Sequence, residues 1–219
     1  MPKTIRNKFD EYLTYEKLME AHNKSKKGKC RKTELIKFNL KQEEYIMWLY
    51  KALKDGTYKH GGYTEFYVRE PKLRKIEKSR YIDRIVHRWI ADNFLLKYFV
   101  TQFIFTSYAC IKNKGMHRAA FYVQDCMRKA KRKWNEYYIL KTDVAKYFDS
   151  IDKEILLNIL KRKIKDEKLI WLINEILYSQ PRKKGIEIGN YTSQVFANIY
   201  LNEVDQYIKH KLKIKYYVR

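Results

Sequence analysis

The chain of 219 residues is 45% hydrophobic and 16% aromatic, so it can bury the core of one large domain or two modest ones. Its 48 Lys and Arg residues outnumber its 25 Asp and Glu residues, and the net charge of +23 favours a polyanionic partner, above all nucleic acid. An anionic membrane is the competing partner, but the sequence has no apolar run of about eighteen residues, no signal peptide and no lipidation motif. We therefore expect a soluble cytoplasmic protein that does not bind membranes.

The cysteine content argues against a disulfide framework and against a zinc site. Cys30, Cys110 and Cys126 are odd in number and widely spaced, and they form neither a CxxC pair nor a cluster with histidine. We expect all three to be reduced thiols.

The first 60 residues are predicted to form two helices. Apolar residues recur at helical spacing after Thr14 and stop at the polar run 22–29, which we expect to be a loop that contacts phosphate groups. The second helix is predicted to begin at Asn39 and to end at Asp55, before a glycine.

An alternating segment follows, and it predicts a β-strand over residues 63–70 that Pro71 ends. The basic residues 72–80 are predicted to be a link to the next helix. That helix begins near Ile82 and is expected to bury Ile85, Val86, Trp89 and Ile90.

The second half of the chain mixes helices with short strands. Residues 103–117 combine β-prone residues with a turn, and a helix with the basic run RKAKRK follows them. Residues 136–144 are predicted to form a buried strand, and Ser150 is predicted to cap the helix after it.

Two further helices and two short strands complete the predicted elements. One helix contains Leu169, Leu172 and Ile176, and the short strand at 182–190 precedes a long helix from Thr192. That long helix is expected to bury one stripe, and residues 214–219 alternate like the opening of a strand. The stripe consists of Leu201, Val204, Ile208 and Leu212.

Asp143 is the first candidate for a chemical role. It follows an apolar run and should lie at the carboxyl end of a strand, where open α/β sheets usually place their functional residues. A short carboxylate there suits a divalent metal site for phosphoryl transfer. The alternative is that Asp143 caps a turn, just as Asp149 and Asp152 are favourable at a helix N-terminus without any further role.

The segment DVAKYFDSID, residues 143–152, resembles the first catalytic motif of reverse transcriptases. In that motif the strand-end Asp binds catalytic magnesium, and an aromatic residue five positions later packs under the incoming sugar. The resemblance implies that Asp143 and the backbone carbonyl of Val144 are metal ligands and that Phe148 excludes a 2′-hydroxyl group. Without the resemblance, Phe148 is one more core aromatic. The remaining nucleotide contacts that the motif implies are Ala145, Lys146 and Tyr147.

A second resemblance lies in residues 185–205. Most reverse transcriptases have Gln-Gly here, followed by Ser-Pro, whereas this chain has Ile188 before Gly189 and Gln194 in the place of the proline. This pattern resembles the reverse transcriptases of diversity-generating retroelements, whose cDNA synthesis is error-prone. The resemblance implies that Ile188, Gly189 and Gln194 contact the nucleotide. It also implies that the nucleotide is less restrained, because Ile188 cannot form the hydrogen bond that a glutamine would form with it. Taken alone, the segment is a loop and a helix cap.

A third resemblance, to the fingers region of the same enzymes, covers residues 62–87. It implies that Lys72 and Arg74 hold the triphosphate of the nucleotide, a task suited to a point charge and a bidentate guanidinium. Without it, both are solvated surface charges. The similar segment FTSYACIKNKGMHRAA implies template or nucleotide contacts for Lys112, Lys114 and His117, although a lone histidine is more often structural.

Together the resemblances imply an α+β fold of the right-hand polymerase type, with helix-rich fingers, the first part of a palm and an incomplete sheet. We expect an N-terminal helical extension at 1–60, fingers at 61–138 and a partial palm at 139–219, with fingers and palm interleaved. The family places its other catalytic carboxylates in a Tyr-x-Asp-Asp motif that these 219 residues do not contain. Two magnesium ions roughly 3.5–4 Å apart need carboxylates from two strands, so we expect a truncated fragment that is inactive alone.

The predicted function is therefore that of an error-prone RNA-directed DNA polymerase from a diversity-generating retroelement. Its expected partners are template RNA, cDNA, dNTP and a small basic accessory protein, and self-association through exposed apolar surface is expected as well. Two alternatives stay open: a non-catalytic RNA- or DNA-binding module, and a reverse transcriptase of the group II intron or retron type.

Overall fold

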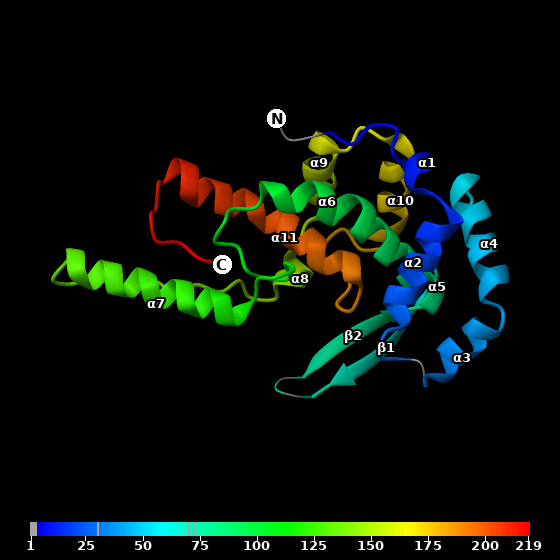
Figure 1. Ribbon diagram of the computed structural model, residues 1–219, viewed down its shortest axis with the longest axis horizontal. Helices are drawn as coiled ribbons and strands as arrows, with labels where there is room; N and C mark the ends of the chain where they lie inside the picture. Colours follow the sequence, from blue (N-terminus) through cyan, green and yellow to red (C-terminus); the bar gives the residue numbers. More distant parts are fainter. Residues whose placement is uncertain (1–3, 30, 70, 72) are drawn as a thin grey trace.

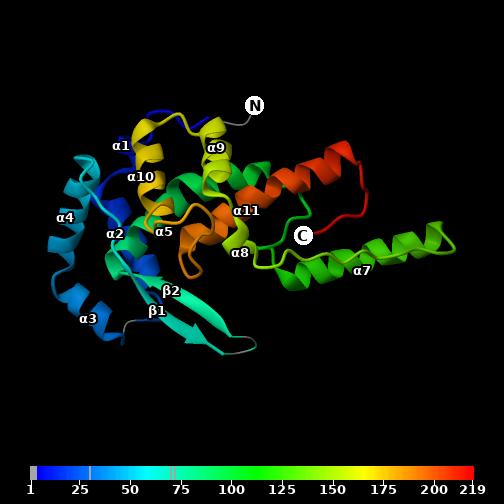
Figure 2. The ribbon, with the colours of Figure 1, turned by 180° about the vertical axis from the view of Figure 1, so that it is seen from behind.

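The computed structural model describes residues 4–29, 31–69, 71 and 73–219 (Figures 1 and 2). These residues form a helix-rich α+β fold, and a two-stranded antiparallel sheet is the only sheet that they contain. The expected α+β class with an incomplete sheet is confirmed. None of the described helices has the length and apolarity that a membrane-crossing segment requires.

Four helices form the N-terminal part: α1 (Phe9–Tyr12), α2 (Tyr15–Lys26), α3 (Thr33–Leu40) and α4 (Gln42–Lys54). The helix predicted after Thr14 is α2, and Thr14 caps it, because its Oγ1 accepts a hydrogen bond from Lys17 N at 3.2 Å. The helix predicted from Asn39 to Asp55 is confirmed as α4, which begins three residues later than predicted, whereas α3 was not predicted. Two helices meet at Lys41, and α3 forms because its apolar residues Leu35 and Phe38 are buried against the core.

The strands β1 (Tyr63–Val68) and β2 (Arg74–Ser79) form a hairpin that projects from the helical body (Figure 1). Tyr63 lies opposite Ser79 at its base, and Val68 lies opposite Arg74 near its tip. The predicted link at 72–80 is therefore wrong where β2 forms. Its charged side chains hid a strand whose stability comes from pairing with β1.

The centre of the fold is α5 (Tyr81–Ile90), which packs against α2 and α11. The four residues predicted to face inward, Ile85, Val86, Trp89 and Ile90, are all fully buried. Each such side chain contributes about 2 kcal/mol by leaving water. A π-helical turn (η1, Ala91–Leu95), α6 (Leu96–Phe99) and a 3₁₀ turn (η2, Val100–Gln102) continue the chain.

Helix α7 (Met116–Lys133) projects from one end of the molecule, and Ala130 is its one buried residue (Figures 1 and 2). The predicted strand at 136–144 is wrong, because this segment has no regular structure and leaves Tyr138 and Leu140 exposed. A strand exists only through its ladder of hydrogen bonds, and no described segment pairs with this one.

The remaining helices are α8 (Tyr147–Ser150), α9 (Lys153–Lys163), α10 (Glu167–Leu177), α11 (Tyr191–Gln206) and the π-helical turn η3 (Tyr207–Lys211). Asp152, rather than Ser150, caps α9, because its carboxylate accepts hydrogen bonds from Glu154 N and Ile155 N at 3.0 and 3.2 Å. The Ser150 hydroxyl donates instead to the carbonyl of Tyr147.

The buried face of α11 also differs from the predicted stripe. Val204 and Leu212 are exposed, whereas the buried apolar residues of the helix lie between Val195 and Ile199; the helix packs against α5 and α9. These residues are Val195, Phe196, Ala197 and Ile199.

The C-terminal segment 214–219 is not a strand, although Arg219 exchanges backbone hydrogen bonds with Thr106 and Tyr108 at 3.0 and 2.7 Å. The Arg219 guanidinium also pairs with the fully buried carboxylate of Asp205 at 2.7 Å. The short strand predicted at 182–190 is likewise reduced to one isolated bridge, between Lys184 and Asp152. In both places a single paired residue replaces the ladder that a strand requires.

Candidate nucleotide and nucleic-acid site

Backbone hydrogen bonds join three of the segments that sequence analysis singled out. The amide of Ile186 donates to the carbonyl of Phe148 at 3.0 Å, which connects α8 to the loop before α11. The amide of Glu77 donates to the carbonyl of Ile188 at 3.1 Å, which connects β2 to the same loop. The loop 185–190 therefore lies between the β1–β2 hairpin and the segment that contains Phe148.

Gly189 allows the loop to approach β2 this closely. Its φ angle is +126°, a conformation that favours glycine. A Cβ atom at this position would lie 3.2 Å from both the carbonyl oxygen of Glu77 and Cγ2 of Ile76. The close approach of the loop to β2 therefore favours glycine at position 189.

A cluster of charged residues that sequence analysis missed lies beside the loop. Nη2 of Arg182 lies 2.7 Å from Oε2 of Glu77 and 3.3 Å from Oε1 of Glu187. Burial raises the pKa of Glu187, and burial lowers the pKa of nearby Lys153, whose ammonium group donates to the carbonyl of Gln180. Local sequence held no signal for this cluster, because an alternating pattern would place Glu187 on the face opposite to Ile186 and Ile188, whereas Glu187 is buried.

The position of Asp143 differs from the prediction. It is exposed in an irregular segment instead of ending a buried strand, and the backbone at the neighbouring Lys146 is left-handed, with φ of +48°. Val144 and Ala145 are exposed as well. The described residues contain no group of three or more His, Cys, Asp or Glu side chains that could hold a metal. On these residues alone, the chain does not fit a site for two magnesium ions.

The aromatic pair after Asp143 is held in place by the core. The hydroxyl of Tyr147 donates to the carbonyl of Ala197 at 2.7 Å, which anchors α8 to α11. Phe148 is half-buried against the core, with its ring 6.0 Å from that of Tyr147. Phe148 therefore packs against the core, while part of its side chain stays accessible to solvent.

The other predicted site residues lie in exposed positions. Arg74 is exposed on β2, Gln194 is exposed in the first turn of α11, and Lys72 lies outside the described residues. Lys112 and His117 are exposed before and within the first turn of α7. Lys114, in contrast, has a local structural role: its ammonium group donates to the carbonyl of Phe105 at 2.6 Å and lies over the rings of Phe105 and Tyr108.

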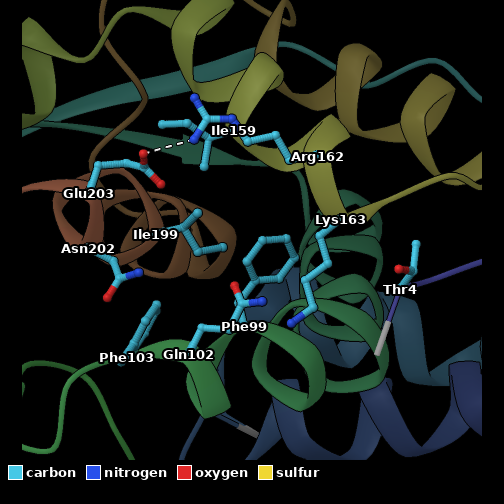
Figure 3. A pocket seen from close by; sticks show the side chains of 10 residues that line it. All are labelled: Thr4, Phe99, Gln102, Phe103, Ile159, Arg162, Lys163, Ile199, Asn202 and Glu203. Atoms are coloured by element: carbon cyan, nitrogen blue, oxygen red, sulfur yellow. Dashed lines mark hydrogen bonds and ion pairs between the residues drawn. The ribbon is translucent and has the colours of Figure 1, made fainter. Parts of the chain in front are cut away.

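A pocket of about 290 Å³ lies elsewhere in the fold, between α9, α11 and the segment that ends in η2 (Figure 3). An ion pair of 2.9 Å between Arg162 and Glu203 crosses it. The ammonium group of Lys163 donates to the carbonyl of Tyr98 and lies 5.4 Å from the centre of the Phe99 ring. None of its lining residues is a predicted site residue, so the backbone contacts around the loop 185–190, and not this pocket, define the candidate site. The lining residues are Thr4, Phe99, Gln102, Phe103, Ile159, Arg162, Lys163, Ile199, Asn202 and Glu203.

Comparison with curated proteins finds distant relatives along most of the chain. The group II intron-encoded protein LtrA of Lactococcus lactis subsp. cremoris is 26% identical over 217 residues, which cover 94% of this chain and 34% of LtrA. The chain is similar to group II intron-encoded proteins. Protein YkfC of Escherichia coli K12 is 24% identical over 152 residues, which cover 64% of this chain and 38% of YkfC. The chain thus spans little more than a third of the length of these relatives, and no protein-family model matches it.

Solved structures give the same indication for the fold. A chain of the partial Cas6-RT-Cas1–Cas2 complex superposes with a TM-score of 0.55 at 16% identity, covering 92% of this chain and 35% of that one. The comparisons show that this chain is similar in sequence to an intron-encoded protein and similar in fold to a chain of the Cas6-RT-Cas1–Cas2 complex. They do not single out the diversity-generating retroelement type, which stays a prediction.

Proposed function

We propose that this chain forms the nucleotide- and nucleic-acid-binding part of an RNA-directed DNA polymerase. One observation carries the proposal: the hairpin, the loop 185–190 and α8, which are distant in sequence, are joined by backbone hydrogen bonds from Glu77 to Ile188 and from Ile186 to Phe148. The segments that resemble polymerase motifs therefore also lie close together in space. The excess of cations supports nucleic acid as the partner.

The proposed roles follow from the sequence resemblance and, for the described side chains, from their exposure. Arg74, exposed on β2, and Lys72 bind the triphosphate of the incoming nucleotide. Ile188 contacts the nucleotide without a hydrogen bond, and the accessible part of Phe148 excludes a 2′-hydroxyl group. Asp143 supplies one carboxylate for magnesium. Because the described residues bring no further carboxylates to it, we assign nucleotide binding and not nucleotidyl transfer to this chain alone.

The more specific proposal is a diversity-generating retroelement enzyme. It depends on Ile188 and Gln194, which replace the glutamine and proline of most reverse transcriptases. A non-hydrogen-bonding side chain at the nucleotide gives a physical reason for low fidelity. The genomic surroundings test this proposal: a neighbouring pair of template and variable repeats is expected, and intron sequence on both sides of the gene would favour a group II intron enzyme instead.

Protein partners are also proposed. The matched structure is a complex in which a reverse transcriptase is assembled with Cas proteins. By the resemblance, a small basic accessory protein is the partner that we propose for this chain. Copurification with the product of a neighbouring gene for such a protein tests this idea.

The first experiment measures RNA binding as salt is raised. If the chain neutralises about six phosphates, its affinity for an RNA–DNA hybrid falls on the order of 10³-fold between 50 and 200 mM salt. An affinity that does not change with salt would contradict the proposal. Primer extension by the chain alone is expected to be absent, since the described residues form no complete carboxylate site.

A second candidate, a non-catalytic nucleic-acid-binding module, is favoured by the absence of a carboxylate cluster among the described residues. Binding of dNTP separates the two functions. We expect dNTP and Mg²⁺ to bind to the chain on a primed template and Arg74→Gln to weaken that binding, while Arg69→Gln, an exposed matched control on the same hairpin, leaves it unchanged. RNA binding without any dNTP binding would establish the second function.

A further inference from the structure

The base of the hairpin makes a side-chain contact with the loop 185–190. The hydroxyl of Tyr63, the first residue of β1, lies 2.8 Å from Oγ of Ser179, which follows α10. The same hydroxyl accepts a hydrogen bond of 3.1 Å from Nδ2 of Asn190. One phenol oxygen therefore joins the hairpin to both ends of the segment between α10 and α11.

Asn190 forms this bond in place of the usual N-cap hydrogen bond to its own helix. It is the N-cap residue of α11, where an asparagine side chain normally accepts a hydrogen bond from the first turn of the helix. Here its side chain makes no cap bond, and its Oδ1 is buried without a partner among the described residues. The side chain is 2% exposed, so water does not readily replace a lost partner. The contact with Tyr63 is thus the one bond that orients the Asn190 amide within the described part of the chain.

The second strand contacts the same loop through its backbone. Glu77 of β2 donates to Ile188 at 3.1 Å, and Gly189 lies against the backbone of β2. Arg74 precedes Glu77 by three positions on this strand, which corresponds to about 10 Å along it. The position of the loop relative to the hairpin therefore sets the distance between Ile188 and Arg74.

We propose that Tyr63 is a positioning residue, which fixes the loop 185–190 against the hairpin so that Ile188 and Arg74 contact one nucleotide at a constant separation. The proposal rests on the proposed function, because it assumes that these two residues bind the same nucleotide. Tyr63 itself does not touch the nucleotide. It acts through Asn190 and the loop.

The test compares Tyr63→Phe with Tyr67→Phe, the same one-atom deletion at an exposed position of the same strand. Tyr63→Phe removes the bonds of the hydroxyl to both Ser179 and Asn190. Hydrogen exchange of the amides in 185–190 and of Glu77 is expected to become at least about two- to tenfold faster, the range for the loss of one hydrogen bond. The dissociation constant for dNTP with Mg²⁺ on a primed template is expected to rise by a similar factor, with RNA affinity unchanged. Tyr67→Phe is expected to change neither quantity.

A second variant keeps the proposal testable if Tyr63→Phe folds poorly. Asn190→Ala removes the donor of the bond from Asn190 to Tyr63. The double variant is expected to be no worse than the more affected single variant, because Tyr63→Phe already breaks that contact. Equal exchange rates in Tyr63→Phe and Tyr67→Phe would overturn the proposal. Equal losses of dNTP affinity and RNA affinity would also overturn it, since they indicate a general structural role. If the unaltered chain binds no dNTP, the proposed function is wrong. The positioning role of Tyr63 is then wrong as well, even if Tyr63→Phe speeds hydrogen exchange in the loop 185–190.

Discussion

The buried ion pair between Arg219 and Asp205 allows a quantitative prediction. The Asp205 side chain is fully buried, and the Arg219 guanidinium contacts it with Nε at 2.8 Å and Nη2 at 2.7 Å. The same guanidinium donates to Oδ1 of Asn198 and to Oγ of Ser107. Arg219→Ala removes all of these bonds and leaves the Asp205 carboxylate with the hydroxyl of Tyr217, at 2.6 Å, as its remaining side-chain donor among those described.

Removal of one partner from a buried pair leaves an uncompensated charge, and it costs about 3–5 kcal/mol of unfolding free energy. For a chain of this length, each kcal/mol lowers the melting temperature by about 2–4 °C. Arg219→Ala is therefore expected to lower it by roughly 6–20 °C.

The matched control is Arg162→Ala, which breaks the ion pair with Glu203. Those side chains are 67% and 47% exposed, so the same substitution is expected to cost less than about 1 kcal/mol. Urea unfolding followed by circular dichroism measures both variants. Equal, small losses of unfolding free energy in the two variants would refute the reasoning, because they would mean that a buried ion pair costs no more to break than an exposed one.

Three further predictions follow from other contacts. Burial lowers the pKa of His87 and of His60, so below about pH 6.5 the unfolded chain binds protons that the folded chain does not. The urea midpoint should therefore decrease between pH 7.5 and pH 5. A midpoint that does not change with pH would contradict this. Gly189→Ala should weaken dNTP binding more than RNA binding in titrations, because its Cβ displaces the loop from β2, whereas Gly62→Ala, in open space, should not. Asp166 caps α10 and accepts from the amides of α1, so Asp166→Ala should cost about 2 kcal/mol in urea unfolding, with exposed Asp55→Ala near zero.

Most helices of this protein could be predicted from the sequence. Helices α2, α5, α7 and α10 were expected because apolar residues recur at a spacing that depends on neighbouring residues alone. Strand β1 was expected for the same reason, since alternation is visible within six residues. Where charged residues obscured the pattern, as in β2, the prediction failed.

The predicted strand at 136–144 failed for a different reason. Its sequence has the composition of a strand, but a strand needs a partner, and the described residues supply none to it. As a result Asp143 is exposed in an irregular segment. The buried face of α11 was also wrong, since the neighbouring helices α5 and α9 decide which of its residues are covered.

For the candidate site, the sequence alone determined which segments carry polymerase-like residues: 143–152, 185–205 and 62–87. Only the tertiary structure decided that these segments meet, through the bonds from Ile186 to Phe148 and from Glu77 to Ile188. It alone revealed the charged cluster around Arg182 and the contact between Tyr63 and Asn190. The physical reason is that local patterns depend on residues a few positions apart, whereas Glu77 and Ile188 come together only when the core between them has formed.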